Sequence, residues 1–197
     1  VWWFLLFWIP AYLSSVYDLN STQSAPHVFV VYAISMISVF AAGYFPAYFM
    51  NKKKMDPYQG RMRAMLLFAF FPLLILLAQP LGSISVWMPV IIIGIAAAAH
   101  QSWSANIFTT VSDMFPKHAV GTITGIGGMA GGVGSFFINK SSGVLFDHAA
   151  NTNMKFLGYE GIESGYFIIF IFCAIAYLLG WTIMKALVPK YELITDM

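Results

Sequence analysis

Six long apolar segments limit what this chain can fold into more than any other feature. They cover approximately residues 1–17, 28–50, 64–81, 86–111, 119–145 and 164–187. A bilayer core about 30 Å thick is crossed by about 20 apolar residues in a helix. Helices satisfy their own backbone hydrogen bonds, which lipid cannot do. Because the apolar runs lack the period-two alternation of strands, the sequence predicts an all-α membrane protein of six transmembrane helices.

Charged residues are too scarce to cover a surface that faces water. They make up 9% of the 197 residues, whereas a soluble domain is about one quarter charged. The net charge of +2 gives no argument for nucleic acid as a partner, so the expected partner is the lipid bilayer. The chain opens in the apolar run VWWFLLFWIP with no charged stretch before it, so no signal peptide is expected. We expect the chain to be a piece whose N-terminal part is missing.

The Lys and Arg residues predict how the helices are oriented in the membrane. If the six segments alternate in direction, eight of the ten basic residues fall on one side, and only Lys140 and Lys155 fall on the other. This bias predicts that the C-terminus is cytoplasmic, in a protein integral to a plasma membrane such as a bacterial inner membrane. The eight are Lys52, Lys53, Lys54, Arg61, Arg63, Lys117, Lys185 and Lys190.

The acidic residues argue against an enzyme embedded in the membrane. None of them lies deep in an apolar segment, which excludes an aspartyl pair within these six spans. Serine hydrolase chemistry has no support either, because the sequence has no nucleophile-elbow motif. No enzymatic activity and no cofactor are therefore expected. The acids, all in loops or at segment ends, are Asp18, Asp56, Asp113, Asp147, Glu160, Glu163, Glu192 and Asp196.

Polar side chains gather in the fourth apolar segment, which makes it the candidate site. Polar groups in hydrocarbon are costly unless they are paired, so in membrane helices they often mark function. We predict that Gln101, Trp103 and Asn106 face a central cavity, and that Phe108 and Thr109 line the cytoplasmic half of the path. The alternative is a structural or assembly protein without a substrate, in which these groups only hold helices together.

Three readings of His100, near the middle of the fourth segment, remain open. It can bond to a neighbouring helix as a neutral side chain, take part in substrate or proton binding, or, least favoured, bind a metal. The aromatic residues Trp2, Trp3 and Phe7 in the first segment have two readings. They can belong to an interfacial belt or stack on a sugar ring at the depth of the cavity.

Seven glycines between residues 121 and 134 predict close helix contacts. Glycines four residues apart let helix backbones approach each other. The fourth segment has a matching stripe in Gly94, Ala98 and Ser102, so we expect it to pack against the fifth. A nucleotide loop is not expected here, because such a loop needs a preceding strand.

Three stretches are typical of one transporter family. They are WWFLLFWIPAYL (2–13), GYFPAYFMNKKKMDPYQGRMRAM (43–65) and the segment 100–135, in which the turn Ser112-Asp113-x-x-Pro116 precedes the glycines. On these residues the chain resembles the C-terminal six-helix half of a major facilitator superfamily transporter. The resemblance is closest to the anion:cation symporters, and within them to the hexuronate and related sugar-acid transporters.

The resemblance implies secondary active transport of a small organic anion by alternating access between two six-helix halves. A hexuronate such as glucuronate is the implied substrate, a proton or sodium ion the coupling ion, and the absent N-terminal half a partner. Gln101, Trp103 and Asn106 would contact the sugar, with Trp3 and Phe7 as weaker candidates. At the contact of the fourth and fifth segments, helix movement would use Gly125, Gly128 and Gly132. No charge relay is expected in the loop 51–63, whose basic residues would only anchor it.

Overall fold

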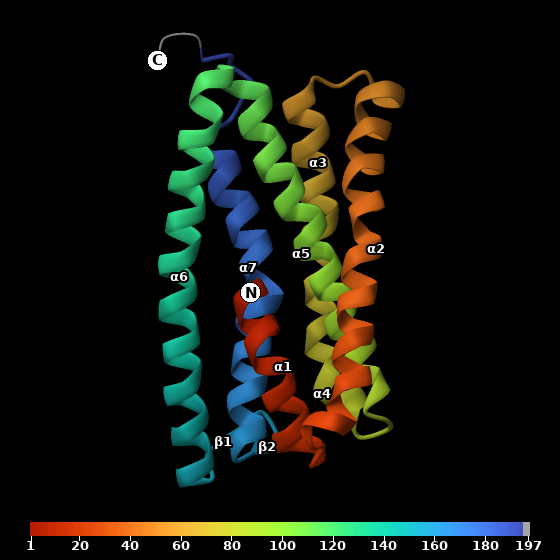
Figure 1. Ribbon diagram of the computed structural model, residues 1–197, viewed down its shortest axis with the longest axis vertical. Coiled ribbons are helices and arrows are strands. Elements are labelled where there is room, and N and C mark those ends of the chain that lie inside the picture. The colour runs from red at the N-terminus through yellow and green to blue at the C-terminus, as the bar shows by residue number, and fades with distance from the viewer. Residues whose placement is uncertain (195–197) are drawn as a thin grey trace.

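The computed structural model describes residues 1–194 and is a bundle of helices, which confirms the all-α fold class (Figure 1). Asp196 lies outside the described residues. Five helical stretches in the described part of the chain are long and apolar enough to cross a membrane. With 16 residues, α1 is shorter than these. The elements are α1 (Trp2–Tyr17), α2 (Ser21–Lys53), α3 (Pro57–Phe70), the 3₁₀ helix η1 (Phe71–Leu77), α4 (Ala78–Gly82), α5 (Trp87–Met114), α6 (Lys117–Thr152) and α7 (Ile162–Leu187).

Local sequence explains where several helices begin and change form. Asn20 and Gln23 bond to each other's backbone N–H and form a capping box at the start of α2. Asp56 caps α3, where Pro57 follows at the first helical position. Pro72 lies in the first turn of η1, so the third predicted segment is one helical stretch with a 3₁₀ interruption.

The predicted loop 146–163 was wrong in its first part, because α6 continues to Thr152. The helix ends at Asn153, which takes the left-handed conformation, and a short hairpin follows. Its strands are β1 (Lys155–Phe156) and β2 (Tyr159–Glu160). Lys155 Nζ lies 2.6 Å from Glu160 Oε1, and this hydrogen bond lowers the pKa of the Glu160 carboxyl.

Small residues of α5 pack against α2, which contradicts the predicted partner. A Cβ at Gly94 would lie 2.8 Å from Ile34 Cδ1 of α2, and Ser102 Oγ donates to the Ser38 carbonyl at 2.9 Å. The α6 glycines have a different environment: a Cβ at any of the seven between 121 and 134 would meet nothing within 4 Å. The expected tight packing of the fourth segment on the fifth was therefore wrong, because its small face meets the second.

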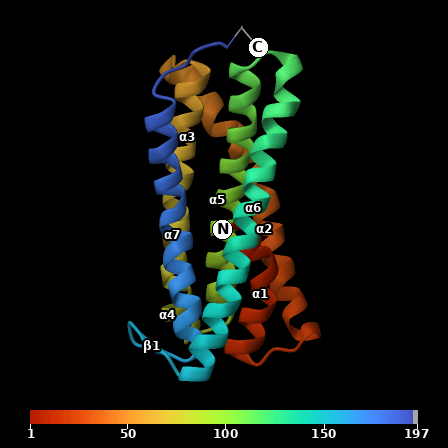
Figure 2. The same cartoon turned by 90° about the vertical axis from the view of Figure 1, so that its left-hand side faces the viewer.

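The two ends of the bundle differ in charge. The connections α2–α3 and α5–α6 and the chain's last described residues lie at one end, at the top of Figure 1, and the hairpin lies at the other (Figures 1 and 2). Of the eight basic residues assigned to one side from the sequence, Arg61 and Arg63 lie in the first two turns of α3, and the others lie at helix ends or in connections at the upper end. The N-terminus lies at mid-height, beside α5 and α7 (Figure 1). Trp2 and Trp3 thus lie near the middle of the bundle, which argues against an interfacial belt.

Candidate functional site

A cavity of about 750 Å³ lies between four helices and is the candidate site. The amino end of α1 closes part of it, and α5, α6 and α7 form the walls. Pockets for small ligands have volumes of about 300–1,000 Å³. Its lining includes the polar, aromatic and glycine residues Trp2, Trp3, His100, Gln101, Trp103, Ser104, Phe108, Thr124, Gly127, Gly128, Gly131, Gly134, Ser135 and Tyr177.

The cavity wall combines neutral hydrogen-bonding groups with aromatic rings. Gln101 and Ser104 come from α5, and Thr124 and Ser135 face them from α6. The described residues that line the cavity include neither Asp or Glu nor Lys or Arg. Such a wall can bind a polar solute through neutral donors and acceptors and can stack on a ring, while it repels neither sign of charge.

His100 lies in an aromatic cluster that joins three helices. Its Nδ1 lies 2.5 Å from the Tyr177 hydroxyl of α7. The Trp2 ring of α1 stacks on the imidazole, with centroids 5.2 Å apart and planes at 9°. The structure therefore shows His100 bonded to a neighbouring helix and also placed in the cavity wall. In the described part of the chain, no group of three His, Cys, Asp or Glu residues could hold a metal ion.

Trp103 contributes the other indole of this cluster from the next turn of α5. Its ring meets the Tyr177 ring edge-on at 5.4 Å, and it packs near Gly180, where a Cβ would lie 3.6 Å from the indole. Its Nε1 is buried and has no hydrogen-bond partner among the described residues. A buried donor without a partner is unfavourable by about 1–3 kcal/mol, so the residue contributes its ring rather than its N–H to the cavity wall.

The structure brings together four of the seven predicted substrate-binding residues. Trp3, Gln101, Trp103 and Phe108 all line the cavity. Sequence reasoning did not single out Tyr177, the partner of His100 on α7. Nothing in the apolar run around Tyr177 distinguishes it from the other aromatic residues there, because its role depends on which helix lies opposite.

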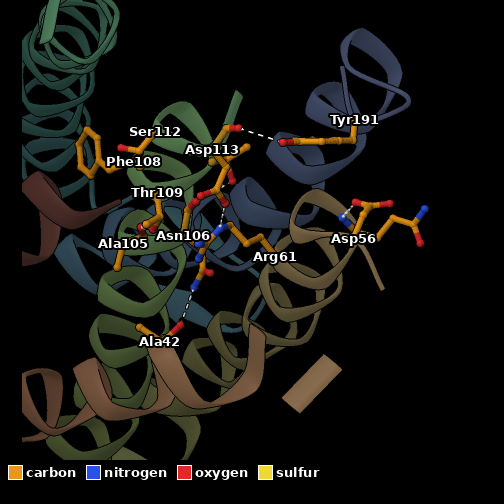
Figure 3. A network of polar contacts seen from close by, with 12 residues as sticks. Ala42, Asp56, Arg61, Ala105, Asn106, Phe108, Thr109, Ser112, Asp113 and Tyr191 are labelled. Atoms are coloured by element: carbon orange, nitrogen blue, oxygen red, sulfur yellow. Dashed lines mark hydrogen bonds and ion pairs between the residues drawn. The ribbon is translucent and has the colours of Figure 1, made fainter. Parts of the chain in front are cut away.

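Asn106 was wrongly expected to face the cavity. The residue is 1% exposed and lies on the face of α5 that packs against α2. Its Nδ2 donates to the carbonyls of Ala42, at 3.1 Å, and Ser102, at 2.8 Å (Figure 3). The amide is used to bridge two helices, so in this structure it cannot also reach a solute in the cavity.

Thr109 and Phe7 also lie outside the cavity lining. Thr109 is exposed and donates its hydroxyl proton to the Ala105 carbonyl one turn earlier (Figure 3). Phe7 is 59% exposed and borders a separate surface pocket of about 360 Å³ beside Trp8 and Asn139. Phe7 does stack with Trp3, at 6.0 Å between centroids, and so borders the site through its neighbour.

The three glycines assigned to helix movement have different positions. Gly128 lines the cavity, together with Gly127 and Gly131, whereas Gly125 and Gly132 do not. Since none of the three would bring a Cβ within 4 Å of another group, they do not form the expected contact with α5. On the cavity side, the glycines keep the α6 wall free of side chains and widen the space.

An ion pair at the upper end of the bundle was also not expected from the sequence. Arg61 Nε of α3 lies 2.6 Å from Asp113 Oδ2 at the end of α5, and their side chains are 16% and 25% exposed (Figure 3). The Tyr191 hydroxyl donates to the Asp113 carbonyl at 3.1 Å. Arg61 is thus more than an anchor, because it joins the ends of two helices. Asp113 was visible in the Ser-Asp-x-x-Pro turn, but its partner was not.

Comparison with known proteins identifies the family. A search of curated proteins and a search of solved structures each gave no match. The family model of the Major Facilitator Superfamily matches residues 1–138, which include α1 to α5 and the part of α6 that lines the cavity. This match covers more than half of the chain and agrees with the apolar helices of the bundle. The chain belongs to the Major Facilitator Superfamily, a family of membrane transporters.

Proposed function

We propose that this chain is one six-helix half of a secondary active transporter that carries a small organic anion. Transport proceeds by ion-coupled symport with alternating access, and a second six-helix half, N-terminal to this chain, completes the protein. The observation that carries the proposal is the cavity of about 750 Å³, whose described lining offers neutral donors and contains no carboxylate that would repel an anion.

The distribution of polar groups on α5 favours transport over a purely structural role. In a structural protein, all of these groups would bind other helices, as Ser102 and Asn106 do. Gln101 and Ser104 instead line an open space. One face of α5 thus holds the bundle together while the next face is available to a solute.

A hexuronate such as glucuronate is the substrate that we propose, and its choice rests on the resemblance of the sequence. The site is compatible with it: a sugar ring can stack on the indoles of Trp3 and Trp103, and its hydroxyls can bond to Gln101, Ser104 and Thr124. We further propose that the basic upper end of the bundle is cytoplasmic, in a plasma membrane.

Uptake of labelled glucuronate by the full-length protein in proteoliposomes tests this function. We expect saturable uptake by the wild type and a KM about fivefold higher for Gln101→Ala, because a neutral hydrogen bond is worth about 1 kcal/mol. Gln59→Ala is the matched control: its side chain is exposed at the start of α3, and only its backbone N–H is used in capping.

The control should transport like the wild type. If Gln101→Ala has a wild-type KM, the cavity is not the binding site. If the wild type takes up another organic anion but not glucuronate, the cavity is still the proposed binding site and that anion replaces glucuronate as the proposed substrate. If the wild type takes up none of the organic anions tested, the proposed function is contradicted.

A further inference from the structure

We propose that His100 binds the coupling proton of the transport cycle and that Tyr177 changes the direction of its hydrogen bond when the proton arrives. This inference rests on the proposed function and specifies its coupling ion and the place where the ion binds. It selects proton binding among the three readings of His100 that the sequence left open.

Among the described residues that line the cavity, His100 is the one whose side chain gains a positive charge when it takes up a proton. It lies in the middle part of α5, one of the helices long and apolar enough to cross the membrane. Ionisable side chains at such depth are rare, and they typically mark ion or proton paths.

The contact between His100 and Tyr177 has two forms. In neutral His100 with its proton on Nε2, the Tyr177 hydroxyl donates to Nδ1, which lies 2.5 Å away. In the imidazolium both ring nitrogens carry protons, so Nδ1–H becomes the donor and the Tyr177 oxygen the acceptor. The Tyr177 hydroxyl proton must then turn to another acceptor. Tyr177 also lines the cavity, where an anion would supply that acceptor.

The surroundings of His100 can hold an imidazolium without a carboxylate. The Trp2 ring lies parallel to the imidazole at 5.2 Å, a geometry in which an indole face attracts a cation. From α7 it meets Tyr177, beside which lies Cys173, and from α1 it meets the uncharged ring of Trp2. From α6, the residues that line the same cavity contribute hydroxyls and glycines but no charged side chain.

Protonation links the proton to the anion. An imidazolium would be the first positive side chain in the cavity wall, so an anion would bind the protonated site more tightly. By linkage, the bound anion strengthens proton binding by the same factor. The two solutes therefore load and unload together, which is what symport requires. The Tyr177 hydroxyl, released from Nδ1, adds a second donor to the anion at the same step.

The transport test separates coupling from substrate binding. In proteoliposomes of the full-length protein, we expect the wild type to accumulate labelled glucuronate when an inward proton gradient is applied. His100→Gln should lose this accumulation and keep exchange of internal unlabelled for external labelled glucuronate, because exchange needs no net proton movement. Accumulation that persists in His100→Gln overturns the proposal. A wild type that shows neither accumulation nor exchange would instead count against the proposed function.

A fluorescence titration tests proton binding without transport. Protonated imidazole quenches an adjacent indole, so we expect the Trp2 emission of the purified full-length protein to fall on acidification. The titration uses a Trp87→Phe background, because the Trp87 ring lies 4.3 Å from that of His27 and would be quenched as well. In this background the acid-dependent part should vanish in both Trp2→Phe and His100→Gln and remain in Trp8→Phe, whose indole bonds to Asn139 instead. Added glucuronate should move the change to higher pH.

If His100→Gln loses both exchange and accumulation, transport alone cannot separate substrate binding from proton binding, and the titration makes the decision. A glucuronate-dependent titration of the wild type that is absent from the variant supports His100 as the proton site. If the acid-dependent quenching persists in His100→Gln, or if glucuronate leaves its midpoint unchanged in the wild type, the proposal is overturned.

Discussion

Gln101 and Asn106 lie within two turns of the same helix, yet the structure gives them opposite surroundings. Asn106 shares a face with Ser102 and Thr110, each one turn away, and that face is buried against α2. Gln101 shares a face with Ser104 and Phe108, which borders the cavity. The position of each residue around the helix axis, rather than its chemical type, therefore decides which polar group is available to a solute.

From the sequence, these residues could be recognised as too polar for lipid. Which of them meets a neighbouring helix could not be identified, because that requires the positions of α2 and α7. His100 shows the same limit. Its bond to another helix was among the expectations, but Tyr177 as the partner depends on the packing of α5 against α7.

Asn106→Ala should weaken the fold without changing substrate affinity. The variant loses two hydrogen bonds, one of them to α2, so we expect a loss of about 1 kcal/mol in the free energy of unfolding. Unfolding of the full-length protein in detergent measures the loss, and the KM for glucuronate should equal that of the wild type. If the variant has a raised KM and an unchanged free energy of unfolding, Asn106 contacts the substrate and its assignment to helix packing is contradicted.

At the scale of the helices, α5 packs its small-residue face closely against α2, and α6 forms an open wall. Helix positions followed from the apolar runs and from capping residues such as Asn20 and Asp56. The partner of the small-residue stripe on α5 did not follow. Stripes at four-residue spacing occur on both α5 and α6, and spacing alone states only that a close approach is possible.

Leucine at Gly94 and at Gly125 should have different effects. At Gly94 even a Cβ would lie 2.8 Å from Ile34, so we expect Gly94→Leu to lower the free energy of unfolding by about 1–3 kcal/mol through overpacking. At Gly125 a Cβ meets nothing within 4 Å, so the same substitution should be tolerated. Thermal unfolding of the two variants in detergent makes the comparison; equal losses would show that α6 is packed as tightly as α5.

For the whole molecule, the separation of basic residues between the two ends is the feature from which we propose an orientation of the bundle in the membrane. Alternation of the predicted segments grouped the basic residues at one end of the bundle, because each segment becomes one helical stretch and reverses the chain direction. Which end is cytoplasmic stays a prediction. The ion pair of Arg61 with Asp113 could not be foreseen, since it joins residues 52 positions apart across the upper end.

Labelling of introduced cysteines tests the orientation. In a Cys173→Ala background, we expect a membrane-impermeant maleimide added to intact cells to modify Leu157→Cys, at the hairpin, where Leu157 is 70% exposed. Lys53→Cys, at the end of α2, should react only after the membrane is permeabilised. The reverse pattern would place the basic end outside.

The central claim is that an organic anion occupies the cavity between α1, α5, α6 and α7, and substrate protection tests it most directly. Gly131 lines this cavity, and a Cβ there meets nothing within 4 Å. In the full-length Cys173→Ala protein, we predict that Gly131→Cys reacts with a small maleimide and that glucuronate, but not glucose, slows the reaction. If the cysteine does not react because other parts of the protein fill the space, or if no transported anion protects it, the account is contradicted.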